Sequence, residues 1–114
     1  MKFNKITYYS AESILDCSDF EDSIYNELCN ELSTSWDNLL FSFDENEPDV
    51  DNFYGIILEL EGISECRDIS EELKIYTIGD LKYCVIDKDN GVKGICINIE
   101  DLQEFQNIIN EYGI

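Results

Sequence analysis

The segment KIYTIGDLKYCVIDKDNGVKGICINI, residues 74–99, decides the fold. Its β-branched and aromatic residues gather in three runs that predict strands. These runs are Lys74–Ile78, Leu81–Asp87 and Val92–Ile99. Gly79-Asp80 suits a type II′ turn and Asn90-Gly91 suits a type I′ turn, because these residues tolerate the positive φ that such turns need. The segment therefore predicts a three-stranded antiparallel meander.

The second turn also predicts a register between the last two strands. A two-residue turn at Asn90-Gly91 places Ile86 opposite Ile95 and Cys84 opposite Ile97. Both pairs would then lie on one buried face of the sheet.

Two amphipathic helices flank the strands in the sequence. In SDFEDSIYNELCNEL, residues 18–32, Ser18 and Glu21 form a capping-box pattern, and apolar residues recur every four positions. The segment EDLQEFQNIINEYG, residues 100–113, carries a second apolar stripe, with Asn98 able to cap its start. Both segments are typical of helices that pack one face on a sheet.

Further strands are expected over residues 2–9, 39–43 and 53–60, whereas residues 62–72 are polar and indicate a loop with a helical turn at Ser70. Strands that follow one another between two helices are typical of the α+β class. We expect one domain over residues 1–114, with a mainly antiparallel sheet of about five or six strands. The two helices are expected to cover one face of it.

The composition indicates a globular chain without export. Apolar residues make up 44% of the 114 residues, and no long uncharged apolar run or secretory h-region occurs. The five cysteines are odd in number and widely spaced, which favours reduced, mostly buried thiols over disulfides. The prediction is a cytoplasmic protein.

The charge is strongly negative and unevenly placed. The chain has a net charge of −19, and residues 11–72 contribute −18 of it with Arg67 as their one base. We do not expect direct binding to nucleic acid or to an anionic membrane, because phosphate contacts need Lys and Arg. A basic protein partner is favoured instead.

The residues that carry most enzyme chemistry are missing. The chain has no histidine, so catalytic triads and histidine metal sites are absent, and it has no C-x-x-C or nucleotide-binding glycine loop. The segment Asp87–Gly91 departs from the calcium-loop spacing and fits a hairpin turn better. We therefore predict no catalytic residues, no metal and no cofactor, and a chain that is not an enzyme.

The candidate partner-binding residues are acidic side chains with two aromatics beside them. Five carboxylates fall within the eight residues of DENEPDVD, two more lie on the first helix, and Trp36 and Tyr54 flank the acidic run as aromatic anchors or as core residues. The predicted set is Asp19, Asp22, Asp44, Glu45, Glu47, Asp49, Asp51, Tyr54 and Trp36.

These features predict a small acidic inhibitory protein that blocks the basic, nucleic-acid-handling site of a partner. Carboxylates on a rigid domain can imitate phosphates and steer association with Arg and Lys. The favoured hypothesis is an immunity protein that neutralises a bacterial nuclease toxin. One alternative is a phage-encoded inhibitor of a host defence nuclease, and a second is a non-inhibitory structural or regulatory interaction module. The oligomeric state stays open.

Overall fold

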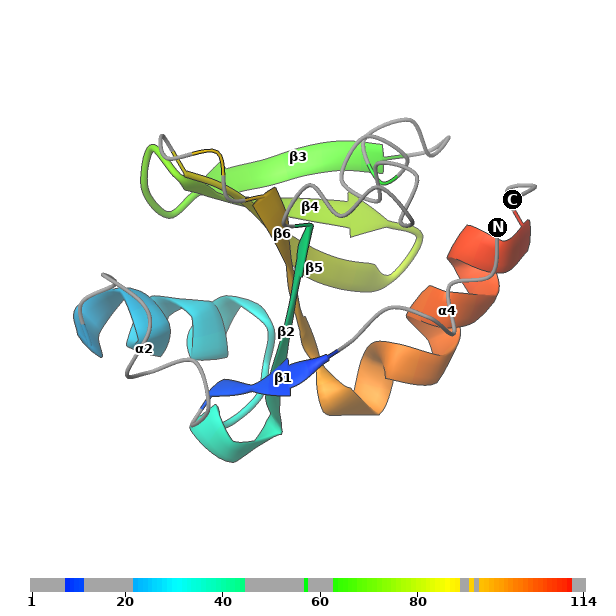
Figure 1. Cartoon of the computed structure of the whole chain (residues 1–114), viewed down its shortest axis with the longest axis horizontal. Coiled ribbons are helices and arrows are strands. Elements are labelled where there is room, and N and C mark those ends of the chain that lie inside the picture. The colour runs from blue at the N-terminus through cyan, green and yellow to red at the C-terminus, as the bar shows by residue number, and fades with distance from the viewer. Residues whose placement is uncertain are drawn as a thin grey trace.

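The computed structural model describes residues 8–11, 22–44, 57, 63–88, 91 and 93–111 (Figure 1). Six strands form one sheet of order β1-β2-β6-β5-β4-β3, in which every neighbouring pair is antiparallel. The strands are β1 (Tyr9–Ser10), β2 (Leu39–Asp44), β3 (Ile63–Asp68), β4 (Leu73–Ile78), β5 (Leu81–Asp87) and β6 (Lys93–Asn98). The helices whose bounds are described are α2 (Asp22–Glu31) and α4 (Leu102–Glu111), and the short 3-10 turns are η2 (Trp36–Asn38), after α2, and η3 (Ile99–Asp101), before α4. The α+β class is confirmed.

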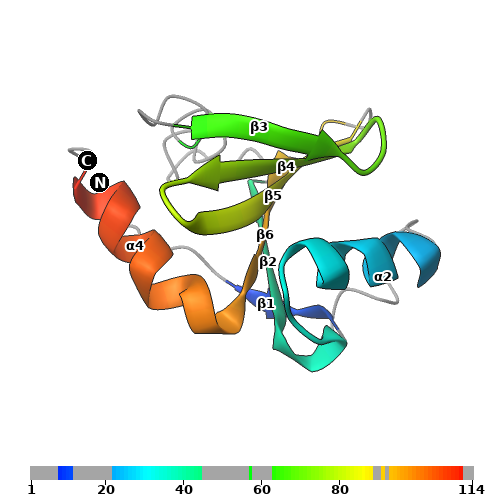
Figure 2. The ribbon, with the colours of Figure 1, turned by 180° about the vertical axis from the view of Figure 1, so that it is seen from behind.

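The two helices cover opposite faces of the sheet, and the expectation of one covered face is wrong (Figures 1 and 2). Leu28 of α2 packs in one core cluster with Cys84 of β5. Phe105 of α4 packs in a second cluster with Tyr83 and Val85 of the same strand. Side chains alternate between faces along a strand, so a strand that is apolar at consecutive positions is buried on both sides.

The predicted meander is present, and its first turn is confirmed. Ile78 pairs with Leu81 across a two-residue turn in which Gly79 has a φ of +60°. Among the described residues other than glycine, only Ser33 has a positive φ, so Asp80 does not. Positive φ at the first central position alone is the requirement of a type II′ turn.

The predicted register between β5 and β6 is wrong by one residue. Cys84 lies opposite Cys96, and Ile86 lies opposite Gly94. The backbone N–H of Gly91, at a φ of +88°, donates to the Lys88 carbonyl oxygen over 2.9 Å. A turn closed in this way lengthens the connection by a residue compared with a two-residue turn, and an added residue shifts every pair.

The structure has a strand where a loop was expected. β3 lies within residues 62–72, and Ser70 lies in a bend rather than a helical turn. β3 is at the end of the strand order and carries a register shift between Glu65 and Arg67. Charged residues and bulges are typical of edge strands, and they remove the apolar alternation on which the prediction depended.

The strand predicted over Phe53–Leu60 is wrong at Ile57, which is its only described residue. Ile57 is helical and fully buried in the cluster beneath α4. An apolar run of this length fits a buried helical segment as well as a strand. In the strand predicted over residues 2–9, Tyr9 belongs to β1, and residues 2–7 lie outside the described part.

Both predicted helices are confirmed within the described residues. Tyr25 and Leu28 are the buried residues of α2, and Phe105 and Ile109 are those of α4. Asn98 caps the second helical segment, because its side-chain oxygen accepts a hydrogen bond from the Glu100 N–H over 3.1 Å. The capping box predicted at residues 18–21 lies outside the described part.

Candidate functional site: an acidic surface beside helix α2

Helix α2 buries one side and exposes carboxylates on the other. Tyr25 and Leu28 are buried, whereas Asp22 and Glu27 are exposed. This is the separation expected when an amphipathic helix packs on a sheet. The acidic side of the helix is therefore held outward by the packing of its apolar side.

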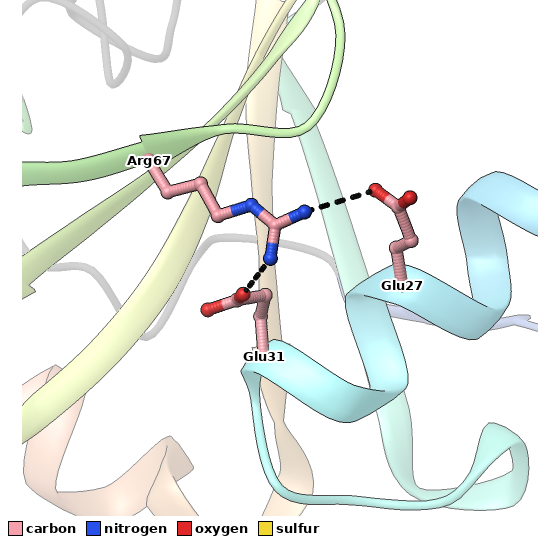
Figure 3. A network of polar contacts seen from close by, with 3 residues as sticks. All are labelled: Glu27, Glu31 and Arg67. Atoms are coloured by element: carbon pink, nitrogen blue, oxygen red, sulfur yellow. Dashed lines mark hydrogen bonds and ion pairs between the residues drawn. The ribbon is translucent and has the colours of Figure 1, made fainter.

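Arg67 of β3 lies between two carboxylates of α2 (Figure 3). Its Nη2 lies 3.8 Å from Glu27 Oε2, and its Nη1 donates to Glu31 Oε1 over 2.6 Å. Glu27 and Glu31 are one helical turn apart, where like charges repel each other. The guanidinium relieves that repulsion and ties the edge of the sheet to the helix. The only base of residues 11–72 is thus paired within the chain.

One end of the sheet gathers several acidic residues from different strands. β2 ends at Asp44, which lies opposite Lys93, and Lys93 in turn lies opposite Asp87. The Asp87 N–H donates to the Glu72 carbonyl oxygen over 2.9 Å, in the turn that follows Asp68 at the end of β3. The antiparallel order therefore places the last residues of β2, β3 and β5 at the same end of the sheet.

This end of the sheet adjoins the acidic side of α2. Arg67, which contacts α2, directly precedes Asp68, and Asp68, Glu71 and Asp87 are exposed. Asp37 of η2 is also exposed, but η2 precedes the start of β2 and so lies at the other end of that strand from Asp44. We call the exposed or half-buried carboxylates of this region the acidic surface: Asp22, Glu27, Glu31, Asp68, Glu71, Glu72 and Asp87.

The structure places some of the predicted site residues. Asp22 is exposed on α2, and Asp44 is the last residue of β2, at the acidic end of the sheet. Trp36 is half-buried and meets Tyr25 edge-on, with ring centroids 4.3 Å apart. That contact belongs to the core beneath α2, which favours the packing interpretation of Trp36 over that of an interface anchor. The other predicted residues lie outside the described part: Asp19, Glu45, Glu47, Asp49, Asp51 and Tyr54.

Other members of the acidic surface were not predicted. Asp68, Glu71 and Glu72 lie in the strand and turn that the sequence presented as a polar loop. Asp87 was assigned to the correct strand, but its position across Lys93 from Asp44 depends on the pairing of β2 with β6. The sequence indicated an acidic region through its low number of Lys and Arg residues. That count does not show which carboxylates lie close together in the fold.

Carboxylates are not confined to this side of the molecule. Glu100, Glu104 and Glu111 are exposed in or beside α4. The α2 side differs because carboxylates of the helix lie beside the end of β3, where Arg67 contacts Glu27 and Glu31.

Burial raises the pKa of three titratable side chains of the core, Tyr83, Cys84 and Cys96. Burial raises the pKa of the Cys84 and Cys96 thiols well above the usual range, which keeps them protonated at neutral pH. Burial likewise raises the pKa of Tyr83. Among the described residues, no group of three or more His, Cys, Asp or Glu side chains is arranged to hold a metal ion.

No protein-family model, curated protein or solved structure matches the chain. In the part of the chain that the structure describes, neither helix has the length and apolar character needed to cross a membrane. Over the described residues, the fold and surface define an acidic α+β domain in which a six-stranded antiparallel sheet lies between α2 and α4.

Proposed function

We propose that this chain is a small acidic inhibitory protein that binds the basic, nucleic-acid-handling site of a partner protein. The preferred setting is an immunity protein that neutralises a bacterial nuclease toxin. The observation that carries the proposal is the charge of −18 over residues 11–72, in which Arg67 is already paired by Glu27 and Glu31. Other carboxylates of this region, among the described residues Asp22, Asp37, Asp68 and Glu71, are exposed to cationic side chains of a partner.

The apolar surface supports an electrostatic mode of binding. Among the described residues, Tyr9 and Ile99 are the only large hydrophobic side chains that are exposed, at 44% and 45%. Both faces of the sheet are filled by the core clusters. Recognition through this part of the chain would therefore depend on charge and hydrogen bonds, which favour rapid association with an oppositely charged partner.

Two other functions share these features. A phage-encoded inhibitor of a host defence nuclease would present the same carboxylates to a basic nucleic-acid site. A structural or regulatory module that uses acidity for solubility is favoured by the exposed carboxylates near α4, Glu100, Glu104 and Glu111. An inhibitor, unlike such a module, has a specific basic target.

The proposal is tested by affinity capture from a lysate of the source cells at low salt, repeated at high salt. At 1 M salt, exposed charges more than about 3 Å apart are screened from each other, whereas at 0.01 M only charges more than about 30 Å apart are screened. We expect recovery of one basic nuclease at low salt, loss of much of it at high salt, and inhibition of that nuclease by the purified chain. Recovery of no specific basic protein would argue for the structural module.

A further inference from the structure

Three cysteines meet in the core beneath α2. Cys29 of the helix is half-buried, whereas Cys84 of β5 and Cys96 of β6 are fully buried. All three belong to the cluster that α2 covers, and none of them is in a disulfide. The sequence did not place them together, because the predicted register put Cys84 opposite Ile97.

Cys84 and Cys96 are direct cross-strand neighbours. The Asp87 N–H points toward the β4 side, because it donates to the carbonyl oxygen of Glu72, the residue before β4. Backbone groups alternate in direction along a strand, and Cys84 is three residues from Asp87, so the N–H and C=O of Cys84 point the opposite way, to β6. Cys84 and Cys96 are therefore a hydrogen-bonded pair. The Cα atoms of such a pair are about 5.5 Å apart. That Cα separation lies within the range of disulfides, at about 4.4–6.8 Å, whereas the Cβ atoms of a hydrogen-bonded pair, about 5.5 Å apart, must approach to about 3.5–4.5 Å.

The native fold protects both thiols. Each has an exposed fraction of 0%, and residues of α2, among them Leu28, pack in the same cluster. Burial keeps the thiols protonated, and the thiolate is the nucleophile in disulfide exchange. Reaction therefore requires the helix to leave the sheet.

We propose that Cys84 and Cys96 are a latent redox pair that closes into a cross-strand disulfide when α2 opens. In the presence of a small-molecule disulfide such as oxidised glutathione, one cysteine thiolate attacks the glutathione disulfide and releases one glutathione thiolate. The second cysteine thiolate then attacks the resulting mixed disulfide and releases the other glutathione. The two protein thiols lose two electrons and two protons, and two glutathione thiols gain them.

The disulfide and the thiol pair present different packing surfaces to α2. The two sulfur atoms approach to about 2.05 Å in a disulfide, closer than two thiols in contact. Interiors are close-packed, so this movement alters the surface on which Leu28 rests. The disulfide thus forms only after the helix has opened, and it disfavours repacking of α2 on the sheet. Reduced glutathione reverses the change.

The test uses the full chain with oxidised glutathione, over a series of urea concentrations below the unfolding midpoint. Opening of α2 is followed by the fluorescence of Trp36, the only tryptophan, which contacts Tyr25 of the helix. After acid quenching and alkylation, trypsin cleaves after Lys82, Lys88 and Lys93. Residues 83–88 and 94–114 then remain joined only if Cys84 and Cys96 are bridged, with the loss of two hydrogens.

We expect the joined peptide to form about tenfold or more faster in urea that opens α2 than in its absence, because local opening controls access. Cys29, which is half-buried, should react with iodoacetamide without urea, and a Cys29→Ser variant should give the same joined peptide. Equal rates with and without urea would overturn the gating by α2. Absence of the joined peptide at every urea concentration, or its loss in Cys29→Ser, would overturn the pair itself.

Discussion

Arg67 on β3 donates a hydrogen bond from Nη1 to Glu31 Oε1 on α2 over 2.6 Å, which joins the edge of the sheet to the helix above it. The side chain of Arg67 is 52% exposed, and that of Glu31 is 19% exposed. Solvent screening limits such a pair to about 0.2–1 kcal/mol. The ion pair therefore contributes little to the free energy that holds α2 on the sheet, and the core beneath α2 contributes most of it.

A double-mutant cycle of Arg67→Gln and Glu31→Gln should give a coupling energy of about 0.5 kcal/mol at low salt and close to zero at 1 M salt. The measurement is urea unfolding of the four proteins. Lys82→Gln, which also removes an exposed cation from a strand, serves as the control for net charge. A coupling energy of zero at low salt would contradict the role of the ion pair.

Gly94 lies where two strands approach too closely for a side chain. A Cβ at this position would overlap the Ser42 carbonyl oxygen and lie 2.9 Å from Phe43 Cα. Because both obstacles are backbone atoms, Gly94→Ala should separate β6 from β2 and cost about 3 kcal/mol or more.

The matched control is Gly79→Ala. A Cβ there meets nothing within 4 Å, and only the positive φ of +60° opposes it. We expect a loss of about 1–2 kcal/mol in urea unfolding. An equal or smaller loss at Gly94 would show that β2 and β6 are not paired in the described register.

Ser33 ends α2 in a left-handed conformation, with a φ of 52°. The Thr34 N–H donates to the Cys29 carbonyl oxygen over 3.0 Å, as in a helix C-cap that glycine usually occupies. Ser33→Gly should raise the free energy of unfolding by about 0.5–1 kcal/mol, because glycine adopts this conformation without a Cβ clash. Ser35→Gly, at a φ of −106°, should instead leave stability unchanged or lower it. The opposite order in thermal unfolding would contradict this C-cap.

The hydroxyl of Tyr83 is buried without a hydrogen-bond partner, while its ring packs against Phe105 at a centroid distance of 5.4 Å. Leaving such a group unpaired costs about 1–3 kcal/mol. Tyr83→Phe should therefore raise the free energy of unfolding by about 1 kcal/mol, whereas Tyr83→Leu should lower it through loss of the ring contact. A loss of stability in Tyr83→Phe would show that the hydroxyl has a partner.

The same residue contributes to alkaline unfolding. Burial raises the pKa of Tyr83 above its usual value of 10.0 and the pKa of Tyr8 to about 12. A raised pKa in the folded state means that the neutral form stabilises the fold fully below pH 10, and that this stability is lost as the pH rises through the folded pKa. Tyr83→Phe should flatten the decline of stability above pH 10.

The sequence predicted the helices and strands that carry a clear apolar pattern within their own residues. The apolar runs and turn glycines of residues 74–99 were sufficient for β4, β5 and β6, and the apolar stripes were sufficient for α2 and α4. β3 was missed because its charged residues, among them Arg67 and Asp68, suit an edge strand and resemble a loop. The register error at Cys84 came from the turn before Gly91, where one extra residue moves each pair.

The candidate site was predictable in charge and not in position. The excess of acids over residues 11–72 is plain in the sequence, and Asp22 is exposed as expected. The pairing of Arg67 with Glu27 and Glu31 depends on β3, so it could not be foreseen. Likewise, the placement of Asp44 and Asp87 on either side of Lys93 depends on the strand order β2-β6-β5, which local patterns do not contain.

Charge reversal separates a local binding surface from a general negative field. Glu45→Lys, Glu47→Lys and Asp49→Lys together change the acidic run, and Asp80→Lys, Glu104→Lys and Glu111→Lys change exposed acids elsewhere by the same amount. The first triple should slow association with the captured nuclease about tenfold more than the second, since steering depends on charge near the contact. Equal effects would remove the acidic run from the interface.

The most direct test of the proposed function is competition for the nuclease. Fluorescence anisotropy of a labelled nucleic acid bound to a catalytically inactive form of the nuclease is followed as the unlabelled chain is added. An inhibitor that occupies the nucleic-acid site should release the nucleic acid completely, with one chain per nuclease, and less effectively as salt increases. Formation of a complex in which the chain and the nucleic acid are bound together would contradict the claim.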